Sequence, residues 1–528
     1  MVWFALAVLH LSQVAPTELE ARIAATPVLT VGELRRSRPA ELLVVDCAGL
    51  PDSRKIATMF LQGRTNRDGP RLYLRGLNEF NDRADDWWLE RLKSEYGIAS
   101  RRIPWDAAFK ELGGTLGGIV IWDDKLPATE NIAGMLSSLC SWVACAPSDL
   151  EAVKASTGLT VVCDLRGVWT DPLVAQRWAL QHLVPKLPRR DIGCLCTRAA
   201  LTTDPRLCRD WLVMRGGVMI DLSSTRPEER ALKDEFYGQM APGSIVWGWV
   251  TFDGEVPHVE HASRFSLEVL CTTSSPNLSV FAQLEPKQTS WVQRHSPPPR
   301  PIERKLYVAF CMSDGDAPPI ALTRYWYRWD DPSRGHVPMA WEVQPLLAEL
   351  APIVLEYYYE TATPSDRFVS APPYVLPTKL PDPTAYMDEA ARVSAFCDLN
   401  IVYQGNDAID ERLGLRWAQR FPNASGFIYG WGEKPKETPR LIAGRPHIWY
   451  GVIMDPPEKH GEEYYQAIYD KMDAYARQWG LPAVLFVHLS NYHAGPADVA
   501  KMMQVLRGAP AEVVPFDTAM EITRALLH

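Results

Sequence analysis

The sequence predicts an α/β protein in two parts, with an incomplete, seven-stranded β/α barrel in the C-terminal part. Three observations lead to this fold class. A chain of 528 residues is too long for a single core and implies several domains. A proline-rich segment, Ser296–Pro301, divides the chain and is typical of a linker. Apolar runs alternate with amphipathic stretches on both sides of it, which favours parallel strands joined by helices.

The N-terminal region, residues 1–285, is expected to be a composite of two or three small α/β subdomains. Its short apolar runs are typical of buried strands. The expected strands are Leu42–Val45, Arg71–Leu74, Gly118–Trp122, Leu159–Cys163 and Val218–Leu222, with another apolar run at Ser244–Trp249. Between them, Asp85–Glu95 and Leu173–Leu183 have the apolar spacing of helices.

Residues 286–304 form the expected linker, and residues 305–528 form the expected barrel. The strands are placed at Lys305–Cys311, Ile353–Tyr359, Asn400–Tyr403, Gly426–Tyr429, His447–Val452, Ala483–Leu489 and Glu512–Pro515. The helices between them are placed at Asp388–Phe396, Asp407–Arg420, Glu462–Trp479 and Ala497–Leu506. Seven such strands are one short of a complete β/α barrel.

Composition argues against several classes of partner. The net charge is −9 with no basic stripe, so nucleic acid is not an expected partner. No apolar segment reaches the roughly 20 residues of a membrane span. The ten cysteines lack the spacing of a zinc site or a disulfide framework. The run Val2–Leu9 resembles the apolar part of a signal peptide without its positive start, which slightly favours export to the periplasm or the medium.

The most informative segment is Ser313–Asp316, which directly follows the first expected barrel strand. Two carboxylates, Asp314 and Asp316, stand at the carboxyl end of a buried strand, where α/β enzymes place their chemistry. There they could bind a metal, share a proton, or act as acid and base. The alternative is an Asp-Gly turn in which one aspartate caps the next helix.

The barrel prediction places further polar side chains at the same rim. Because the residues that follow parallel strands converge on one face, we expect Glu360, Glu433 and His488 to lie near Asp314 and Asp316. Paired carboxylates can cleave a glycosidic bond, so Asp314, Asp316, Glu360 and Glu433 are the candidate catalytic residues. For His488, a satisfied core histidine is as good an interpretation as a ligand or a base. Glu356 lies within an expected strand, so it either faces outward or belongs to the site.

These segments resemble the motifs of a known family. Ser313–Asp316 is similar to an SDGDN motif, and Ser370–Pro377 stands where a GxGYxYP motif would be. Further matching segments run along most of the chain, among them Leu61–Gly63, Arg71–Leu74, Asp164–Trp169, Pro276–Ser279, Pro352–Tyr359 and Asp366–Val369. The chain is therefore identified as a divergent member of the GxGYxYP family of glycoside hydrolases. The resemblance implies a bacterial protein whose C-terminal barrel-like domain carries the activity.

The chain departs from the family motifs at several positions. Ala317 replaces the asparagine after the two aspartates, and Ala371 and Pro373 replace both glycines of the namesake motif. Leu376 replaces its second tyrosine. Proline fixes φ and removes an N–H, so this loop cannot keep a backbone that needs those glycines. Either the substrate differs or the site has become a binding surface.

Three hypotheses for the function follow. The first is a hydrolase of oligo- or polysaccharides without a cofactor, in which Asp314 or Asp316 pairs with Glu360 or Glu433. The second is a metal-dependent enzyme resembling polysaccharide deacetylases, with a divalent cation on Asp314, Asp316 and His488. The third is a non-catalytic carbohydrate-binding or scaffold protein. In the first hypothesis the sugar is contacted by Tyr374, Trp431, Asn406 and His488.

Overall fold

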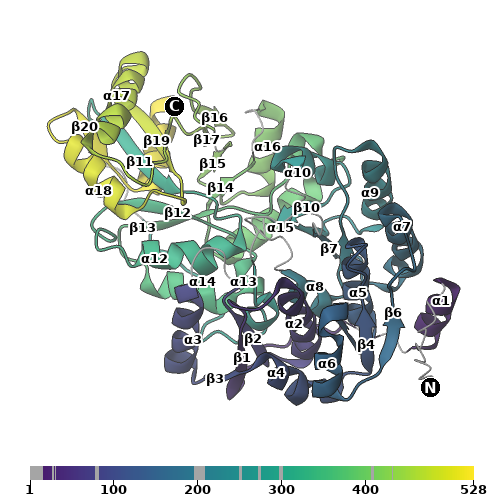
Figure 1. Ribbon diagram of the computed structural model, residues 1–528. Helices are drawn as coiled ribbons and strands as arrows, with labels where there is room; N and C mark the ends of the chain where they lie inside the picture. The colour runs from purple at the N-terminus through teal and green to yellow at the C-terminus, as the bar shows by residue number, and fades with distance from the viewer. Residues whose placement is uncertain are drawn as a thin grey trace, which may run out of the picture.

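The described residues form three small parallel sheets and one larger curled sheet (Figure 1). The structure is a computed structural model that describes residues 16–26, 29, 31–77, 82–195, 208–248, 253–270, 275–295, 301–405, 410–430 and 432–528. The expected signal-like run and most of the proline-rich segment lie outside these ranges. None of the described helices is both long and apolar enough to span a membrane.

The first two sheets have three parallel strands each, in the orders β2-β1-β3 and β5-β4-β6. The first comprises β1 (Glu41–Asp46), β2 (Leu72–Arg75) and β3 (Ala99–Ile103), with helices α2 (Asp52–Thr65), α3 (Asp82–Tyr96) and α4 (Trp105–Leu112). Helix α1 (Pro16–Ala25) precedes this sheet in the chain but lies beside the second one, where its Arg22 donates a hydrogen bond to the carbonyl of Val162 (Figure 1). The second comprises β4 (Gly118–Ile121), β5 (Trp142–Cys145) and β6 (Val161–Asp164), with α5 (Ala128–Leu139), α6 (Leu150–Thr157) and α7 (Pro172–His182).

The third sheet has four parallel strands in the order β10-β9-β7-β8. Its strands are β7 (Asp191–Cys194), β8 (Val218–Ile220), β9 (Ile245–Trp247) and β10 (Glu268–Leu270), and its helices are α8 (Arg209–Arg215), α9 (Pro227–Gln239), α10 (Glu255–Ser263) and α11 (Leu278–Phe281). The strands expected in the N-terminal region correspond to β1, β2, β4, β6, β8 and β9. The edge strand β3 has no apolar signal because its residues are mostly exposed.

The C-terminal sheet has ten strands, nine of them in the order β16-β17-β15-β14-β13-β12-β11-β19-β18, with β20 paired to β11. Their bounds are β11 (Leu306–Met312), β12 (Met339–Val343), β13 (Asp366–Ser370), β14 (Ile401–Tyr403), β15 (Gly426–Ile428), β16 (Arg440–Ile442), β17 (Arg445–Ile448), β18 (Val452–Met454), β19 (Ala483–Leu489) and β20 (Ala511–Val513). The helices are α12 (Tyr325–Trp329), α13 (Leu347–Leu350), α14 (Pro352–Thr361), α15 (Thr384–Phe396), α16 (Glu411–Arg420), α17 (Glu462–Trp479), α18 (Pro496–Val505) and α19 (Phe516–Leu527).

The connection between β17 and β18 shows that this sheet is curled. Only the segment Trp449–Gly451 separates the two strands, yet β17 pairs with β15 and β18 pairs with β19. Because β15 and β19 are far apart in the strand order, the two sides of the sheet must approach each other. Inside the curl, side chains from several strands, such as Ala309, Tyr403 and Phe486, pack with Phe516 of α19 in one buried cluster. The α/β class with a curled sheet is thus confirmed.

One expected strand is wrong. Ile353–Tyr359 lies in the helix α14, while the strands β12 and β13 on either side of it were not expected. Pro352 occupies the first turn of α14, where its fixed φ suits a helix and its missing N–H costs nothing. The helix is buried on most of its faces, so its sequence is apolar all round. Such a run cannot be told from a buried strand by periodicity.

Glu356 of α14 neither faces outward nor belongs to the rim. Its Oε1 accepts hydrogen bonds from the backbone N–H groups of Lys287 (2.7 Å) and Gln288 (2.8 Å), and its Oε2 accepts one from the hydroxyl of Tyr96. A fully buried carboxylate needs such donors to offset its lost hydration. Glu356 therefore joins the C-terminal region to α3 and to the segment that precedes residue 300.

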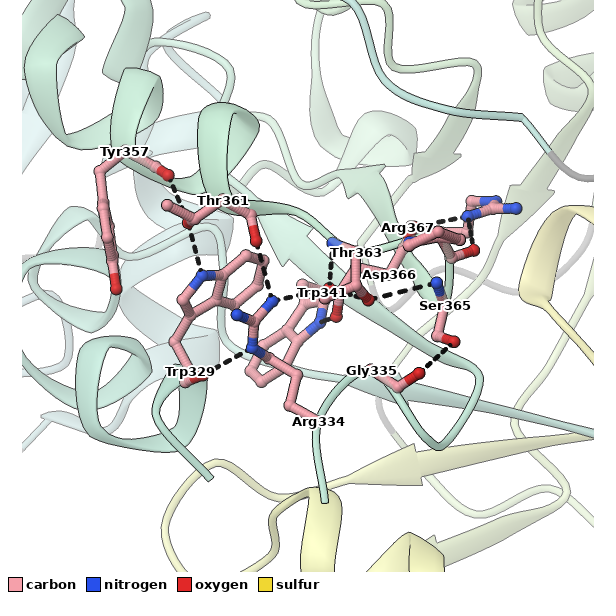
Figure 2. Close-up of polar contacts among 11 residues, drawn as sticks. Trp329, Arg334, Gly335, Trp341, Tyr357, Thr361, Thr363, Ser365, Asp366 and Arg367 are labelled. Atoms are coloured by element: carbon pink, nitrogen blue, oxygen red, sulfur yellow. Dashed lines mark hydrogen bonds and ion pairs between the residues drawn. The ribbon is translucent and has the colours of Figure 1, made fainter. Parts of the chain in front are cut away.

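A second polar network holds the amino end of β13 (Figure 2). The carboxylate of Asp366 accepts hydrogen bonds from Trp341 Nε1 (3.0 Å), Arg334 Nη1 (2.8 Å) and both the N–H (2.8 Å) and the hydroxyl (2.7 Å) of Thr363. The Arg334 guanidinium also lies 4.2 Å from the ring centre of Trp329. The network fixes β12 and β13 at the edge of the sheet opposite the one where Asp314 lies.

Candidate active site

The segment Ser313–Asp316 forms a tight turn at the carboxyl edge of the curled sheet. Asp314 has a φ of +61°, a conformation that costs a residue with a side chain free energy. A Cβ atom on Gly315 would lie 1.9 Å from the carbonyl oxygen of Glu342, so only glycine fits there. Ser313 Oγ donates a hydrogen bond to the carbonyl of Leu489 (3.1 Å). The turn is therefore fastened to β12 on one side and to β19 on the other.

Asp314 has the electrostatic properties of an acid group. Burial raises the pKa of Asp314 from 3.8 to about 6, against the opposing effects of a hydrogen bond from Asn491 and the charge of Arg324. The charge of Asp455 raises it further. A carboxyl group whose pKa lies near neutrality can donate a proton and take it back at the working pH.

Glu342 is a buried carboxylate at the same edge that the sequence analysis missed. It lies near the end of β12, and its Oε1 accepts a hydrogen bond from the hydroxyl of Tyr450 (3.1 Å). Burial, and then the charges of Tyr374, Glu342 and Asp316, raise the pKa of Tyr403 well above its ordinary 10. Asp316 and Glu342 are thus both close enough to act on one phenol, which stands at the end of β14.

A sequence signal for Glu342 did exist. Met339–Val343 is a short run of strand-forming residues with one carboxylate near its end, which is the same pattern that drew attention to Ser313–Asp316. Ile353–Tyr359 is a longer run of strand-forming residues, so the sequence favours it over Met339–Val343 as the second strand. Gln344, which follows β12, was missed for the same reason. Its Nε2 donates a hydrogen bond to the carbonyl of Asp316 (3.0 Å).

Three polar side chains at this edge have buried atoms without a hydrogen-bond partner in the described part of the chain. They are both ring nitrogens of His488, both amide atoms of Gln404, and Oδ1 of Asn491. All three residues are buried and lie at or just after the ends of β14 and β19. Burial lowers the pKa of His488 to about 4, so its imidazole is neutral at pH 7. Buried polar atoms without a partner are rare and call for a ligand or water.

Glu360 and Glu433 do not join this group. Glu360 stands at the carboxyl end of α14, which leads into the amino end of β13, and pairs with Arg91 (3.2 Å). It is therefore at the opposite edge of the sheet from Asp314. Glu433 pairs with Lys471 of α17 (2.9 Å) and accepts a long hydrogen bond from the N–H of Ile453 in β18 (3.4 Å). The predicted sugar contacts Asn406 and Trp431 lie outside the described residues.

The metal hypothesis places a cation on Asp314, Asp316 and His488. Within the ranges that the structure describes, no three His, Cys, Asp or Glu side chains converge as metal ligands. The neutral His488 would suit a metal, but the carboxylates do not meet it in the required geometry. Among the described residues, Asp314, Asp316 and His488 are therefore not grouped as the ligands that this hypothesis requires.

Comparison with known families gives matches along most of the chain. The GxGYxYP_N second domain matches residues 116–187, the GxGYxYP third domain matches residues 196–283, and the GxGYxYP putative glycoside hydrolase C-terminal domain matches residues 304–524. The chain belongs to the GxGYxYP family. The resemblance drawn from Ser313–Asp316 and the altered namesake motif is confirmed, and the C-terminal domain of the family is described as a putative glycoside hydrolase.

The fold of this GxGYxYP protein is also found in a solved structure, that of a putative hydrolase from Bacteroides thetaiotaomicron. The two chains superpose with a TM-score of 0.80 at 19% sequence identity, over 94% of this chain and 99% of that one. At this identity the likeness concerns the fold, which is shared along almost the full length. No curated protein matches the chain.

The altered namesake motif of this GxGYxYP protein directly follows β13, at the carboxyl edge of the sheet. Tyr374 is buried, and its backbone exchanges two hydrogen bonds with Val269 of β10, at 2.7 and 3.0 Å. A Cβ on Gly405 would lie 3.5 Å from the Tyr374 ring. The motif therefore joins the third N-terminal sheet to the rim, and its tyrosine lies beside the end of β14.

Proposed function

We propose that the protein is a glycoside hydrolase whose site lies at the carboxyl edge of the curled sheet. Asp314 is the proton donor, and Asp316 and Glu342 are the candidates for the second carboxylate. Glu342 replaces Glu360 and Glu433 in the pairing that the sequence suggested. In this proposal the curled sheet is an incomplete barrel of seven strands. They are β11, β12, β13, β14, β15, β19 and the pair β17 and β18, which is counted as one strand.

The observation that carries the proposal is the set of buried polar atoms that have no hydrogen-bond partner among the described residues. His488, Gln404 and Asn491 present donors and acceptors at one edge of the sheet, beside the turn that holds Asp314. A sugar offers many hydroxyl groups, each of which can donate and accept a hydrogen bond. A neutral imidazole and a carboxamide are suited to such groups because each carries both a donor and an acceptor.

The chemistry follows from the two kinds of carboxyl group. Asp314, with its raised pKa, donates its proton to the glycosidic oxygen as the bond to the sugar carbon breaks. The second carboxylate stabilises the positive charge that develops on the ring, either by direct attack or by activating water. The leaving alcohol keeps the proton, and water supplies the proton that restores Asp314.

The test is a glycan-array and chromogenic-glycoside screen on the wild type, with and without chelator. On a substrate that is turned over, Asp314→Asn, Asp316→Asn and Glu342→Gln are compared with the control Glu360→Gln. Loss of the proton donor is expected to lower kcat by about 100-fold or more, and Glu360→Gln is expected to leave it nearly unchanged. Chelator is expected to have no effect.

Two outcomes would count against the proposal. If Asp314→Asn and Asp316→Asn leave both turnover and oligosaccharide affinity unchanged, the rim is not the site. If the wild type binds oligosaccharides at the rim without turnover, the protein is a carbohydrate-binding member of the family. The substitutions Ala371 and Pro373 in the namesake motif are the observation that favours this second function.

A further inference from the structure

A second cluster of reactive side chains lies at the carboxyl edge of the third N-terminal sheet, away from the curled sheet. Ser224 stands in the loop between β8 and α9, and its Oγ lies 3.1 Å from Nδ1 of His261 on α10. The other ring nitrogen, Nε2, lies 2.5 Å from Oδ1 of Asp234 on α9. Lys233 Nζ lies 2.9 Å from the same serine oxygen. Hydroxyl, imidazole and carboxylate thus form a continuous chain of hydrogen bonds.

The donors in this chain can be assigned. An ammonium group only donates, so Ser224 Oγ accepts from Lys233 and its own proton points to Nδ1 of His261. The carboxylate of Asp234 only accepts, so Nε2 of His261 carries the ring proton. Burial lowers the pKa of His261 to about 4, against the opposing effect of the hydrogen bond that His261 donates to Asp234. The imidazole is therefore neutral at pH 7 and presents a lone pair to the serine hydroxyl.

The surrounding residues hold this arrangement in place. Asp253 fixes the loop by accepting hydrogen bonds from the N–H of Ser224 and the hydroxyls of Ser223 and Thr225. The His261 ring packs edge-on against Tyr237, with 5.1 Å between ring centres. Loop and imidazole are both positioned by buried contacts, so the serine and the base keep their relative geometry.

The serine and the histidine face a hollow of about 300 Å³, the low end of the range for small-molecule sites. It is lined by Ser224, Thr225, Arg230, Pro257, Glu260, His261 and Arg264. Arg264 is paired with Glu260 (2.5 Å), so Arg230 gives the lining a net positive charge. A neutral or anionic small molecule suits this hollow better than a cation.

We infer that this site is a second active centre, in which Ser224 is the nucleophile, His261 the base and Asp234 the group that orients the imidazole. Its substrate class is a carboxylic ester with a small acyl group. The relay uses the groups of a Ser-His-Asp triad with the two ring nitrogens exchanged relative to the chymotrypsin type. Nothing in the proposed glycoside hydrolysis requires it.

The reaction balances without any further reagent. Ser224 Oγ bonds to the carbonyl carbon as its proton passes to Nδ1 of His261, and the carbonyl oxygen of the substrate becomes negatively charged. The ammonium group of Lys233, beside Ser224 Oγ, stabilises this charge. The carbon–alkoxy bond then breaks, and the alcohol leaves with the proton from His261. Water, deprotonated by His261, attacks the acyl-serine, and the proton returns to Ser224 Oγ. The products are a carboxylic acid and an alcohol.

The test uses the full-length protein. Wild-type protein is treated with a fluorophosphonate probe, the modified serine is located by peptide mass spectrometry, and hydrolysis of 4-nitrophenyl acetate is followed. We expect the probe on Ser224, and a fall in the hydrolysis rate of about tenfold or more in Ser224→Ala and His261→Gln. The control is Ser94→Ala, because Ser94 is an exposed serine of α3 whose hydroxyl donates to the carbonyl of Arg91 in its own helix, away from the imidazole. It should keep both the label and the rate.

Either of two results would overturn the inference: no adduct on Ser224 in the folded wild type, or a rate in Ser224→Ala equal to that of the wild type. The labelling measurement needs no variant, so a variant that fails to fold does not leave the question open. Circular dichroism of each variant shows whether it is folded. Asp234→Asn should keep the label and slow its formation, which a purely structural network would not do.

Discussion

Asp314 is held in a backbone conformation and an environment that both cost free energy. Its positive φ is rare for a residue with a side chain, and such strain costs about 1–3 kcal/mol. Its carboxyl group is largely removed from water, which raises its pKa to about 6. Strain and burial of this kind persist only where the surrounding structure imposes them. Here Asn491 and the close approach of Gly315 to Glu342 impose them.

The raised pKa of Asp314 makes stability depend on pH in a defined window. Between about pH 4 and pH 6 the folded protein holds this proton and the unfolded chain has lost it. The contribution of Asp314 to the free energy of unfolding therefore falls as pH rises, by up to about 3 kcal/mol. Asp314→Asn removes this dependence, so relative to the wild type the variant should gain stability from pH 4 to pH 7.

Urea denaturation of both proteins across that range measures the effect. A difference in the free energy of unfolding that stays constant with pH would show that the Asp314 pKa is not raised.

Gly315 is expected to tolerate no side chain. Its Cβ would lie 1.9 Å from the backbone of Glu342, and backbone cannot move as a flexible side chain can. Gly315→Ala should therefore lower the free energy of unfolding by about 1–3 kcal/mol and displace Asp316 from the edge of the sheet. Thermal unfolding and the kcat of the glycoside screen measure the two effects.

The control is Gly238→Ala in α9, where an added Cβ meets nothing within 4 Å. There alanine should stabilise the protein by about 0.5–1 kcal/mol. Equal effects of the two substitutions would contradict the close packing of the turn on β12.

At the scale of elements, β12 and β13 depend on the network around Asp366 (Figure 2). Asp366→Asn keeps the shape of the side chain but removes its charge, which leaves the largely buried Arg334 without its ion-pair partner. We expect a loss of about 3 kcal/mol in the free energy of unfolding. Because the network is at the amino edge of the sheet, substrate affinity of the protein that remains folded should not change.

The matched control is Asp388→Asn, which breaks a solvent-exposed pair with Arg420. An exposed pair contributes at most about 1 kcal/mol. Chemical denaturation of both variants gives the comparison. An Asp366→Asn variant as stable as Asp388→Asn would show that the network does not hold β13.

At the scale of the whole molecule, the N-terminal and C-terminal regions share one core. Trp88 Nε1 of α3 donates a hydrogen bond to the carbonyl of Leu322 (2.8 Å), and Trp87 stacks on Trp326 with 5.9 Å between ring centres. One cluster of buried apolar side chains runs from Leu19 to Leu506. A continuous apolar cluster of this kind is typical of a single core. Two independent domains joined by a linker would each have a core of their own.

We therefore expect the full chain to unfold in one calorimetric transition. The reason is that unfolding of either region exposes the aromatic surface of the other, which destabilises it. Residues 304–528 expressed alone should be poorly soluble or should unfold at a lower temperature than the full chain. Two separated transitions, the second at the midpoint of the isolated C-terminal region, would contradict this coupling.

The sequence predicted elements well where a single local pattern decides the structure. The alternation of strands with amphipathic helices, seen for β11, β14, β15, α17 and β19, was correctly located. The prediction from sequence was wrong at Ile353–Tyr359. This apolar run is buried on most of its faces, so it has no periodicity that separates a helix from a strand. That one error hid β12, and with it Glu342, and it moved Glu360 to the wrong edge of the sheet.

The sequence by itself determined the α/β class, the family, and the turn that carries Asp314 and Asp316. These depend on local composition and on motifs contiguous in the chain. Only the tertiary structure decided which side chains meet that turn: Glu342 from β12, Gln344 just after β12 and Asn491 just after β19. It alone brought Ser224 to His261, thirty-seven positions further along the chain. Such meetings depend on strand order and on the curl of the sheet, which no local pattern encodes.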